Sequence, residues 1–465
     1  MSVGIPDTFP KDAKPYLKRI DNASNSGLLY VNDLRYLGGK ELQHEVDIVV
    51  VGAGLAGLTT AWLLSKAGLE VRVLEARDRV GGRLYGYKAG ERCIQLGGRW
   101  TGPGQSAVKS LASELDIEVI SNLSFGGRAN PGRGSEFENS AREIDELARS
   151  VPLDKPWQTP NAAKLDRQTL ATWLHTSYGN EIAFEIGSIL SGFLPEPQDV
   201  SLLHALFYLN SNGGFAGILG LDGAPHDSEM FEGGAHRLTD ELYTRLRTSV
   251  KLSTPVSGLR STTDKLVVQT DEGCVSARFA VVALPPVLAG RLRYEPAMPP
   301  DRDYLTQRMP IRGKIAVALL YDQPFWRESG ESIFVDGNLT LWDEGGDELP
   351  AAVAGLVSIP RSRELSMHNP QDRKQAILAC AAAHLGQRAA TVCGYHEINW
   401  AAEPWSRGCN SFMTTGVWST WGYTLREPVG RIHWAGAEMS DRFVGQMDGA
   451  VRSAQVTANR ILETA

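Results

Sequence analysis

The sequence has no long hydrophobic run and no excess of positive charge. None of its apolar stretches reaches the roughly eighteen consecutive residues that a membrane-spanning helix needs, so we expect no membrane insertion. The 47 Lys and Arg residues are outnumbered by 54 Asp and Glu residues, which leaves a net charge of −7. Because no global positive field attracts a phosphate backbone, we expect no nucleic-acid partner either.

Cysteine is scarce, and its spacing argues against two kinds of site. The five cysteines, at positions 93, 274, 380, 393 and 409, are not paired in the way that a zinc site or a disulfide framework requires. We therefore expect no metal and a reducing compartment. Residues 1–45 lack the basic and apolar regions of a signal peptide, and the C-terminal Glu-Thr-Ala is no peroxisomal address. These absences together predict a soluble, cytoplasmic protein.

Length and composition are those of a globular protein. With 465 residues, 42% of them hydrophobic and 22% charged, the chain can bury a substantial core. At roughly 100–200 residues per domain, the length predicts two domains or one two-lobed unit. Residues 1–45 are polar and interrupted by proline and glycine, so we expect an N-terminal extension there.

One stretch predicts a strand–helix–strand unit. Residues 46–51 form a nearly continuous apolar run of strand length, as in a parallel strand buried on both faces. The sequence Gly-Ala-Gly-Leu-Ala-Gly follows at 52–57, residues 58–66 have helical composition, and 70–75 supply a second strand. This order is typical of a nucleotide-binding βαβ unit.

The glycines of this unit, and the acid after its second strand, indicate a dinucleotide site. Gly52 allows a tight turn, Gly54 lets the main chain approach a pyrophosphate, and Gly57 permits close packing of helix on strand. The helix N-terminus offers free N–H groups and a partial positive charge to phosphates. Glu75 can accept hydrogen bonds from both hydroxyls of an adenosine ribose, and it repels the 2′-phosphate of NADP. The alternative, a glycine turn without a ligand, is disfavoured by the βαβ context.

The residues that follow favour FAD over NAD. Residues 76–83, Ala-Arg-Asp-Arg-Val-Gly-Gly-Arg, bring a glycine pair and three arginines next to the ribose acid, which suits a long dinucleotide. From here on the sequence resembles the flavin-containing monoamine oxidase family (flavin amine oxidoreductases). The resemblance spans about residues 46–463 and continues through these segments: 95–103, 231–234, 283–286, 321–327, 399–400, 434–438 and 445–450.

The resemblance implies a fold class and a division of the chain. The fold would be α/β and two-lobed, with a Rossmann-type FAD-binding domain and a substrate-binding domain of mixed sheet plus helices. We expect the FAD-binding domain in residues 46–120, 228–300 and 396–465, and the substrate-binding domain in 121–227 and 301–395. The reactive ring of the flavin would lie between the two lobes.

The resemblance also assigns cofactor contacts position by position. A helix starting near Gln446 would aim its N–H groups at the flavin edge where negative charge collects on reduction. Cys409 matches the position where some monoamine oxidases bond a cysteine to the flavin, with an ordinary packed thiol as the alternative. The full set of expected cofactor residues is Gly52, Gly54, Gly57, Glu75, Arg77, Gly82, Arg83, Gly98, Arg99, Val256, Cys409, Glu438, Gln446 and Met447.

Two departures from the family pattern bear on catalysis. Asn410 and Gln446 occupy the positions where two aromatic rings flank the substrate nitrogen in the family's amine oxidases, and amides favour a polar or hydroxylated amine. The family lysine that reaches flavin N5 through a water aligns with Ala316. Lys314 lies on the same strand face and is either its substitute or a surface lysine. Trp400 is the best candidate for an aromatic contact with the flavin.

These residues lead to a functional hypothesis. We expect an FAD-dependent oxidase that moves a hydride from the α-carbon of a neutral amine to flavin N5 and yields a carbonyl product, ammonia and hydrogen peroxide. Its partners would be the small-molecule amine and O2, and a homodimer stays open. The alternatives are a flavin dehydrogenase or tailoring oxidoreductase acting on a C–C or C–O bond, an L-amino acid oxidase with Arg99 on the substrate carboxylate, and a non-catalytic FAD-binding module. Residues 204–212 lie in a segment that lines the substrate cavity of relatives.

Overall fold

The computed structural model describes residues 42–121, 134–221, 228–329, 333–335, 337–346 and 348–464. Its contacts divide the chain into Met1–Glu41 and Leu42–Ala465, and every described residue belongs to the second unit. The predicted N-terminal extension at 1–45 lies almost entirely outside the described residues. The division of the rest into an FAD-binding and a substrate-binding domain stays a prediction.

The strands and helices have these bounds. The strands are β1 (Leu42–Val51), β2 (Val71–Leu74), β3 (Gly86–Ala89), β4 (Arg92–Gln95), β5 (Trp100–Thr101), β6 (Val119–Ser121), β7 (Glu229–Phe231), β8 (Val250–Lys251), β9 (Val256–Ser261), β10 (Leu266–Thr270), β11 (Gly273–Val282), β12 (Arg293–Glu295), β13 (Ile315–Tyr321), β14 (Ile333–Val335), β15 (Leu339–Asp343), β16 (Ala351–Val357), β17 (Gly394–Asn399) and β18 (Ile432–Trp434). The helices are α2 (Leu55–Lys66), α3 (Ser106–Glu114), α4 (Ser135–Arg149), α5 (Ala162–Asp166), α6 (Leu170–Leu190), α7 (Leu202–Ser211), α8 (Gly214–Leu219), α9 (Arg237–Leu246), α10 (Pro286–Ala289), α11 (Pro300–Gln307), α12 (Ile359–Leu365), α13 (Pro370–Leu385), α14 (Val417–Trp421) and α15 (Met447–Leu462), with short 3-10 turns η3 (Pro156–Gln158), η4 (Phe325–Ser329), η5 (Gln387–Ala390), η6 (Gly422–Thr424) and η7 (Ala437–Met439).

The predicted βαβ unit is confirmed and lies in the larger sheet. β1 pairs in parallel with β2 on one side and with β11 on the other, in the order β12-β9-β10-β11-β1-β2-β8, and β18 also pairs with β11. Ile48, Val49 and Val50 are fully buried, which explains why this segment is an uninterrupted apolar run. β1 begins at Leu42, before that run, because Leu42 and Glu45 pair with Cys274 and Ser276 of β11, with a register shift between the two pairs.

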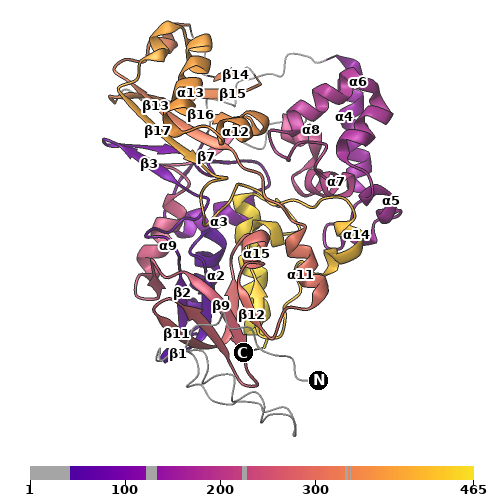
Figure 1. The fold of residues 1–465 in the computed structure, drawn as a ribbon, viewed down its shortest axis with the longest axis vertical. Coiled ribbons are helices and arrows are strands. Elements are labelled where there is room, and N and C mark those ends of the chain that lie inside the picture. Colours follow the sequence, from indigo (N-terminus) through magenta and orange to yellow (C-terminus); the bar gives the residue numbers. More distant parts are fainter. Residues whose placement is uncertain are drawn as a thin grey trace, which may run out of the picture. The chain divides into compact units, whose positions relative to one another are not determined.

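Helices cover one face of this sheet. α2 and α15 lie side by side, with α9 next to α2 and α3 next to α15 (Figure 1). Leu58 of α2 and Val451 of α15 share a buried cluster with Ile48 and Val50 of β1. The alternate residue Val49 belongs to a different cluster, as expected from the two-residue period of a strand.

The smaller sheet is antiparallel, in the order β14-β15-β16-β13-β17. α12 and α13 lie beside it (Figure 1). β13 separates two cores: Val317 packs with Ile377 of α13, whereas Ala316 and Ala318 pack in a cluster that contains Trp400. Lys314 precedes this strand, on the face of Ala316.

A group of helices formed by α4, α6, α7 and α8 makes the remaining large part. α7 begins where the Ser201 hydroxyl accepts a hydrogen bond from the main-chain N–H of His204, a regular N-cap. The imidazole of His204 is buried against Trp418, whose indole N–H donates to Nδ1 at 3.1 Å. Burial lowers the pKa of His204 to about 3, so this histidine is a neutral core residue.

Two expected absences can be examined in the part of the chain that the structure describes. Across these residues, no helix is both long enough and apolar enough to cross a membrane. The same residues contain no group of three or more His, Cys, Asp or Glu side chains that could hold a metal ion.

Candidate active site

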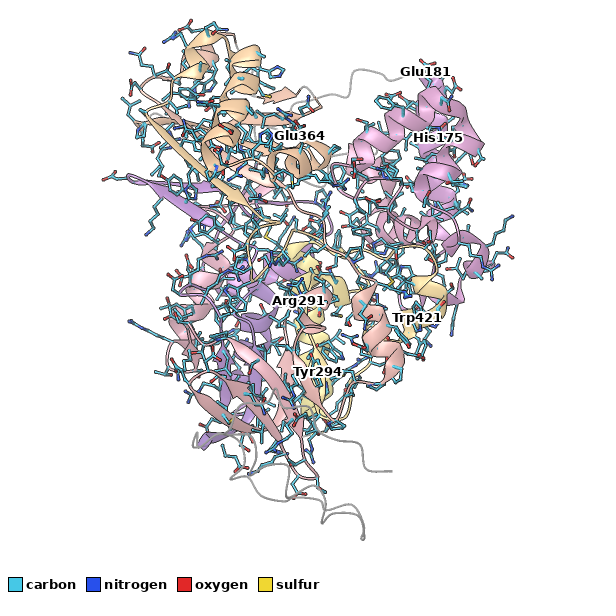
Figure 2. The ribbon with its side chains drawn as sticks, in the orientation of Figure 1. His175, Glu181, Arg291, Tyr294, Glu364 and Trp421 are labelled. Carbon is cyan, nitrogen blue, oxygen red and sulfur yellow. The ribbon has the colours of Figure 1, made fainter. Side chains whose placement is uncertain are left out.

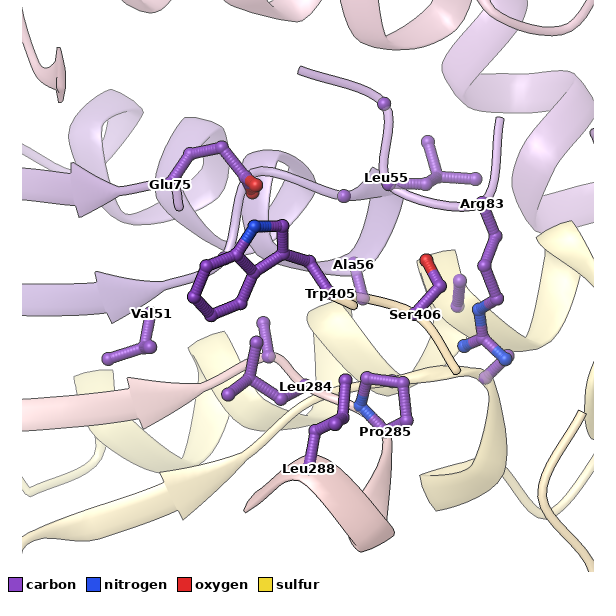
Figure 3. Close-up of a pocket in the computed structure, with 18 of the residues that line it drawn as sticks. Val51, Leu55, Ala56, Glu75, Arg83, Leu284, Pro285, Leu288, Trp405 and Ser406 are labelled. Carbon is purple, nitrogen blue, oxygen red and sulfur yellow. The ribbon is translucent and has the colours of Figure 1, made fainter. Parts of the chain in front are cut away.

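A cavity of about 480 Å³ lies at the carboxyl ends of β1 and β2 and reaches the start of α15. Segments far apart in the sequence line it, and Figure 3 shows Glu75, Arg83, Leu284 and Trp405 around it. The predicted site residues among its lining are Gly52, Gly54, Glu75, Arg77, Gly82, Arg83, Gly98, Val256, Cys409, Asn410, Gln446 and Met447.

The first βα turn has the close packing that the glycines predicted. Gly52 has a φ of 104°, and a Cβ there would lie 3.0 Å from the main-chain oxygen of Ala283. A Cβ on Gly57 would overlap the main-chain oxygen of Gly52. Gly54 caps α2 without a side-chain hydrogen bond, so the N–H groups of the first turn remain for a phosphate.

Glu75 is held next to this turn. Its carboxylate is 4% exposed and accepts hydrogen bonds from the main-chain N–H of Ala53 at 2.7 Å and of Arg77 at 2.9 Å. The Arg77 guanidinium lies 3.6 Å from the same carboxylate and donates to the Ser406 hydroxyl at 2.8 Å. The acid is therefore fixed at the end of β2, beside the phosphate turn, where the ribose of a dinucleotide belongs.

Arg83 lines the cavity and links its own segment to those of Glu438 and Cys409. It makes two hydrogen bonds to the Glu438 carboxylate, at 2.6 and 3.0 Å, and a further one to the main-chain oxygen of Cys409. Burial alone would raise the pKa of Glu438, but the charge and hydrogen bonds of Arg83 hold that pKa below its usual value. Glu438 is 3% exposed and does not line the cavity, so in this structure it positions Arg83.

Cys409, Asn410 and the start of α15 form the other end of the cavity. The main chain of Cys409 donates to the oxygen of Arg312 at 2.7 Å, and the N–H of Arg312 donates to the oxygen of Asn410 at 3.1 Å, which fixes this segment against residues 310–312. Gln446 is the N-cap of α15 and makes no side-chain cap bond. The positive end of this helix therefore faces the cavity.

Five of the predicted residues lie outside this lining: Gly57 and Glu438, described above, and Arg99, Trp400 and Lys314. Arg99 pairs with Glu344, and both side chains are 8% exposed. Trp400 is 5% exposed and donates its indole N–H to the oxygen of Leu96 at 2.9 Å. Lys314 donates to the oxygen of Gly192 at 3.2 Å.

Lys314 has an unusual environment for a lysine. Burial, and next the charge of Arg312, lower the pKa of its ammonium to about 7, because both disfavour the charged form. Arg312 donates to the oxygen of Leu194 at 2.7 Å. Both side chains therefore donate to main-chain oxygens of the turn that follows α6.

Further residues surround the site besides the predicted cofactor-binding and catalytic residues. Trp405, 43% exposed, lies beside Glu75 in the cavity wall (Figure 3). Arg291, which follows α10 (Figure 2), and Ser257 line the cavity as well. Tyr208 of α7 accepts a hydrogen bond from Gln446. Tyr208 belongs to the segment 204–212 that the resemblance had already indicated. Ser257 and Arg291 were missed, and the only signal for Ser257 is its position next to Val256.

Comparison with known proteins agrees with this geometry. The family model described as flavin containing amine oxidoreductase matches residues 55–462, and one described as pyridine nucleotide-disulphide oxidoreductase matches residues 13–96. The chain therefore belongs to the flavin containing amine oxidoreductase family. It is an oxidoreductase that acts on amines with FAD as the cofactor.

Three relatives illustrate the range of the family. The chain is 35% identical to an L-amino acid dehydrogenase of Synechocystis, over 90% of this chain and 94% of that protein. It is 32% identical to a probable flavin-containing monoamine oxidase A of Dictyostelium discoideum, over 88% and 95% of the two chains. Putrescine oxidase, solved with putrescine bound, has a TM-score of 0.83 and 29% identity, over 90% of this chain and 99% of that one.

Proposed function

We propose that this protein is an FAD-dependent oxidase that deaminates a polar or hydroxylated amine and releases a carbonyl product, ammonia and hydrogen peroxide. One observation carries the choice of substrate. Asn410 and Gln446, two neutral amides, line the end of the cavity next to Cys409 and the first turn of α15. An apolar amine gains nothing from such groups, whereas a substrate with further polar groups can pair with them.

The residues around the cavity fit FAD. The first turn of α2 would bind the pyrophosphate, Glu75 the ribose, and Arg83 the middle of the cofactor. When bound, FAD supplies the two-electron acceptor that amine oxidation requires. The N-terminus of α15 offers N–H groups and a partial positive charge where negative charge would collect.

We also propose a covalent link between Cys409 and the flavin. Cys409 is a free thiol and is half-buried, and it lines the cavity together with Ser406 and Asn410. Gln446 and Met447, at the start of α15, line the same cavity, and we propose that the flavin ring lies against this part of the lining. The thiol would keep the cofactor from dissociating.

Lys314 is proposed as the substitute for the family lysine. It precedes β13 on the face of Ala316, the face that packs with Trp400. Its lowered pKa of about 7 means that the side chain changes charge near neutral pH. A cation that can appear and disappear near the flavin would tune the reaction with O2.

The relative named L-amino acid dehydrogenase favours a second candidate, oxidation of an L-amino acid. In this chain, however, the expected carboxylate-binding Arg99 is paired with Glu344, so its charge is already compensated. One experiment separates the candidates: the purified holoprotein is given amino alcohols, alkyl amines, benzylamine and L-amino acids, with O2 or a dye as the acceptor. Peroxide formed with amino alcohols supports the proposal. Turnover of L-amino acids alone, or with the dye alone, overturns it.

A further inference from the structure

Most of the charged side chains around the cavity already have a partner of opposite charge. Within the described part of the chain, the charged lining residues are Glu75, Arg77, Arg83 and Arg291. Arg77 lies 3.6 Å from Glu75 and 3.2 Å from Glu403, and Arg83 lies 2.6 Å from Glu438. The charges of these two arginines are therefore compensated by the protein itself, and the five paired side chains together carry one more negative charge than positive.

Arg291 differs from the other two arginines. It lines the cavity beside Leu288 of α10 (Figure 3), its side chain is exposed, and it forms no ion pair or side-chain hydrogen bond with the residues that the structure describes. Its main chain is held in place, because its N–H donates to the oxygen of Leu288 at 3.0 Å. The preceding Gly290 packs closely on α11, where a Cβ would lie 2.7 Å from the Thr306 hydroxyl. Arg291 is therefore an uncompensated cation on a well-packed segment at the rim of the cavity.

The cofactor FAD brings a pyrophosphate with two negative charges to this cavity. The paired side chains do not attract it, because their summed charge is negative. We propose that Arg291 steers the dianionic cofactor into the cavity, and that it acts on the rate of association rather than on the rate of release. An exposed charge at the rim of a site changes the encounter with a charged ligand, whereas water screens its contribution to the finished complex. This inference concerns cofactor binding and is independent of which amine is oxidised.

The size of the effect follows from Coulomb's law with screening by salt. For a dianion about 10 Å from the guanidinium in water, loss of the positive charge should lower the association rate about threefold at an ionic strength of about 10 mM. The same loss should lower it about 1.5-fold at about 0.15 M, and not measurably at about 1 M. A negative charge in place of the positive one doubles the change in energy, so the rate at low salt should fall about sevenfold.

The test uses Arg291→Gln and Arg291→Glu in the full-length Cys409→Ser protein, from which the flavin is removed. Association and dissociation of FAD are followed by stopped-flow quenching of flavin fluorescence at the three ionic strengths. At low salt the association rate should fall in the order parent, Arg291→Gln, Arg291→Glu; the three rates should converge at high salt, and the dissociation rates should agree within about twofold. Lys164→Gln is the matched control, because it removes the same charge from an exposed residue of α5 that does not line the cavity.

Three results would overturn the inference. Equal association rates of the parent and both Arg291 variants at low salt would make Arg291 an ordinary surface cation. A loss of rate that persists at high salt, or that Lys164→Gln reproduces, would show that the effect is not steering by this side chain. A change confined to the dissociation rate would place the effect in the finished complex instead. If the holoprotein oxidises no amine, the proposed function fails, and the FAD rates still decide this inference. Melting temperatures of all variants show whether each remains folded.

Discussion

Replacement of Glu75 by alanine tests the dinucleotide site directly. In the structure this carboxylate accepts hydrogen bonds from the main chain of Ala53 and Arg77, so its loss loosens the turn as well as the ribose contact. A hydrogen bond to a charged group contributes about 1.5–3 kcal/mol, and water replaces part of what is lost. We therefore expect FAD binding to weaken by about 1–3 kcal/mol, which is roughly 5- to 150-fold in Kd.

The measurement needs a background in which the flavin is not covalently held. In Cys409→Ser protein, the Kd for FAD is measured by quenching of flavin fluorescence, and the melting temperature is recorded with and without FAD. Loss of the hydrogen bonds to Ala53 and Arg77 should lower the melting temperature of the apoprotein. Loss of the ribose contact should instead reduce the increase in melting temperature that FAD produces. Glu70→Ala, an exposed acid at the other end of β2, is the control. A Kd for Glu75→Ala within twofold of the parent, with the same FAD-induced increase, would refute the assignment of Glu75 to the ribose.

Three further predictions concern the flavin end of the cavity. Wild-type protein precipitated with acid should keep its yellow colour in the pellet and carry one flavin mass on the Cys409 peptide, whereas Cys409→Ser should release the colour into the supernatant. A yellow wild-type supernatant and an unmodified protein mass would show that Cys409 is an ordinary thiol. Asn410→Tyr combined with Gln446→Tyr should shift kcat/KM toward benzylamine and away from amino alcohols, and an unchanged panel would mean that these positions do not face the substrate. The third prediction concerns reoxidation of the reduced flavin by O2, measured by stopped flow. The wild-type rate should fall as the pH rises through about 7, because Lys314 loses its charge there. The Lys314→Met rate should be lower by roughly tenfold, about 1.4 kcal/mol, and independent of pH; identical pH profiles for the two proteins would exclude Lys314 from this step.

The nucleotide-binding part of the fold could be predicted because its signals are local. A strand buried on both faces must be apolar throughout, and a turn that packs against a neighbouring strand must contain glycine. Residues 46–57 carry both signals within one short stretch, and the structure confirms the βαβ unit with parallel pairing of β1 and β2. The start of β1 could not be predicted, because Leu42 is included only through its pairing with Cys274, far away in the sequence.

The partners of the site residues could not be predicted for the same reason. Gln446 and Tyr208 are 238 positions apart, and Arg99 and Glu344 are 245 positions apart. No spacing rule links such residues; the packing of α7 against the turn before α15 brings the first pair together. The low pKa of Lys314 is likewise set by burial and by Arg312, neither of which is visible in the strand pattern around Ala316.

These distant partners bear on whether the cavity could bind an L-amino acid, the substrate class in the name of one relative. An amino acid brings a carboxylate that needs a positive charge with a free donor. Arg99 is engaged by Glu344 and Arg83 by Glu438, so each of these two arginines already has its counter-ion. Asn410 uses both of its N–H groups on main-chain oxygens, so its oxygen remains for a ligand, whereas Gln446 keeps its oxygen and one N–H. The pairing of these two arginines is consistent with the proposed preference for a polar amine, and 35% identity is compatible with a different preference because so few side chains set it.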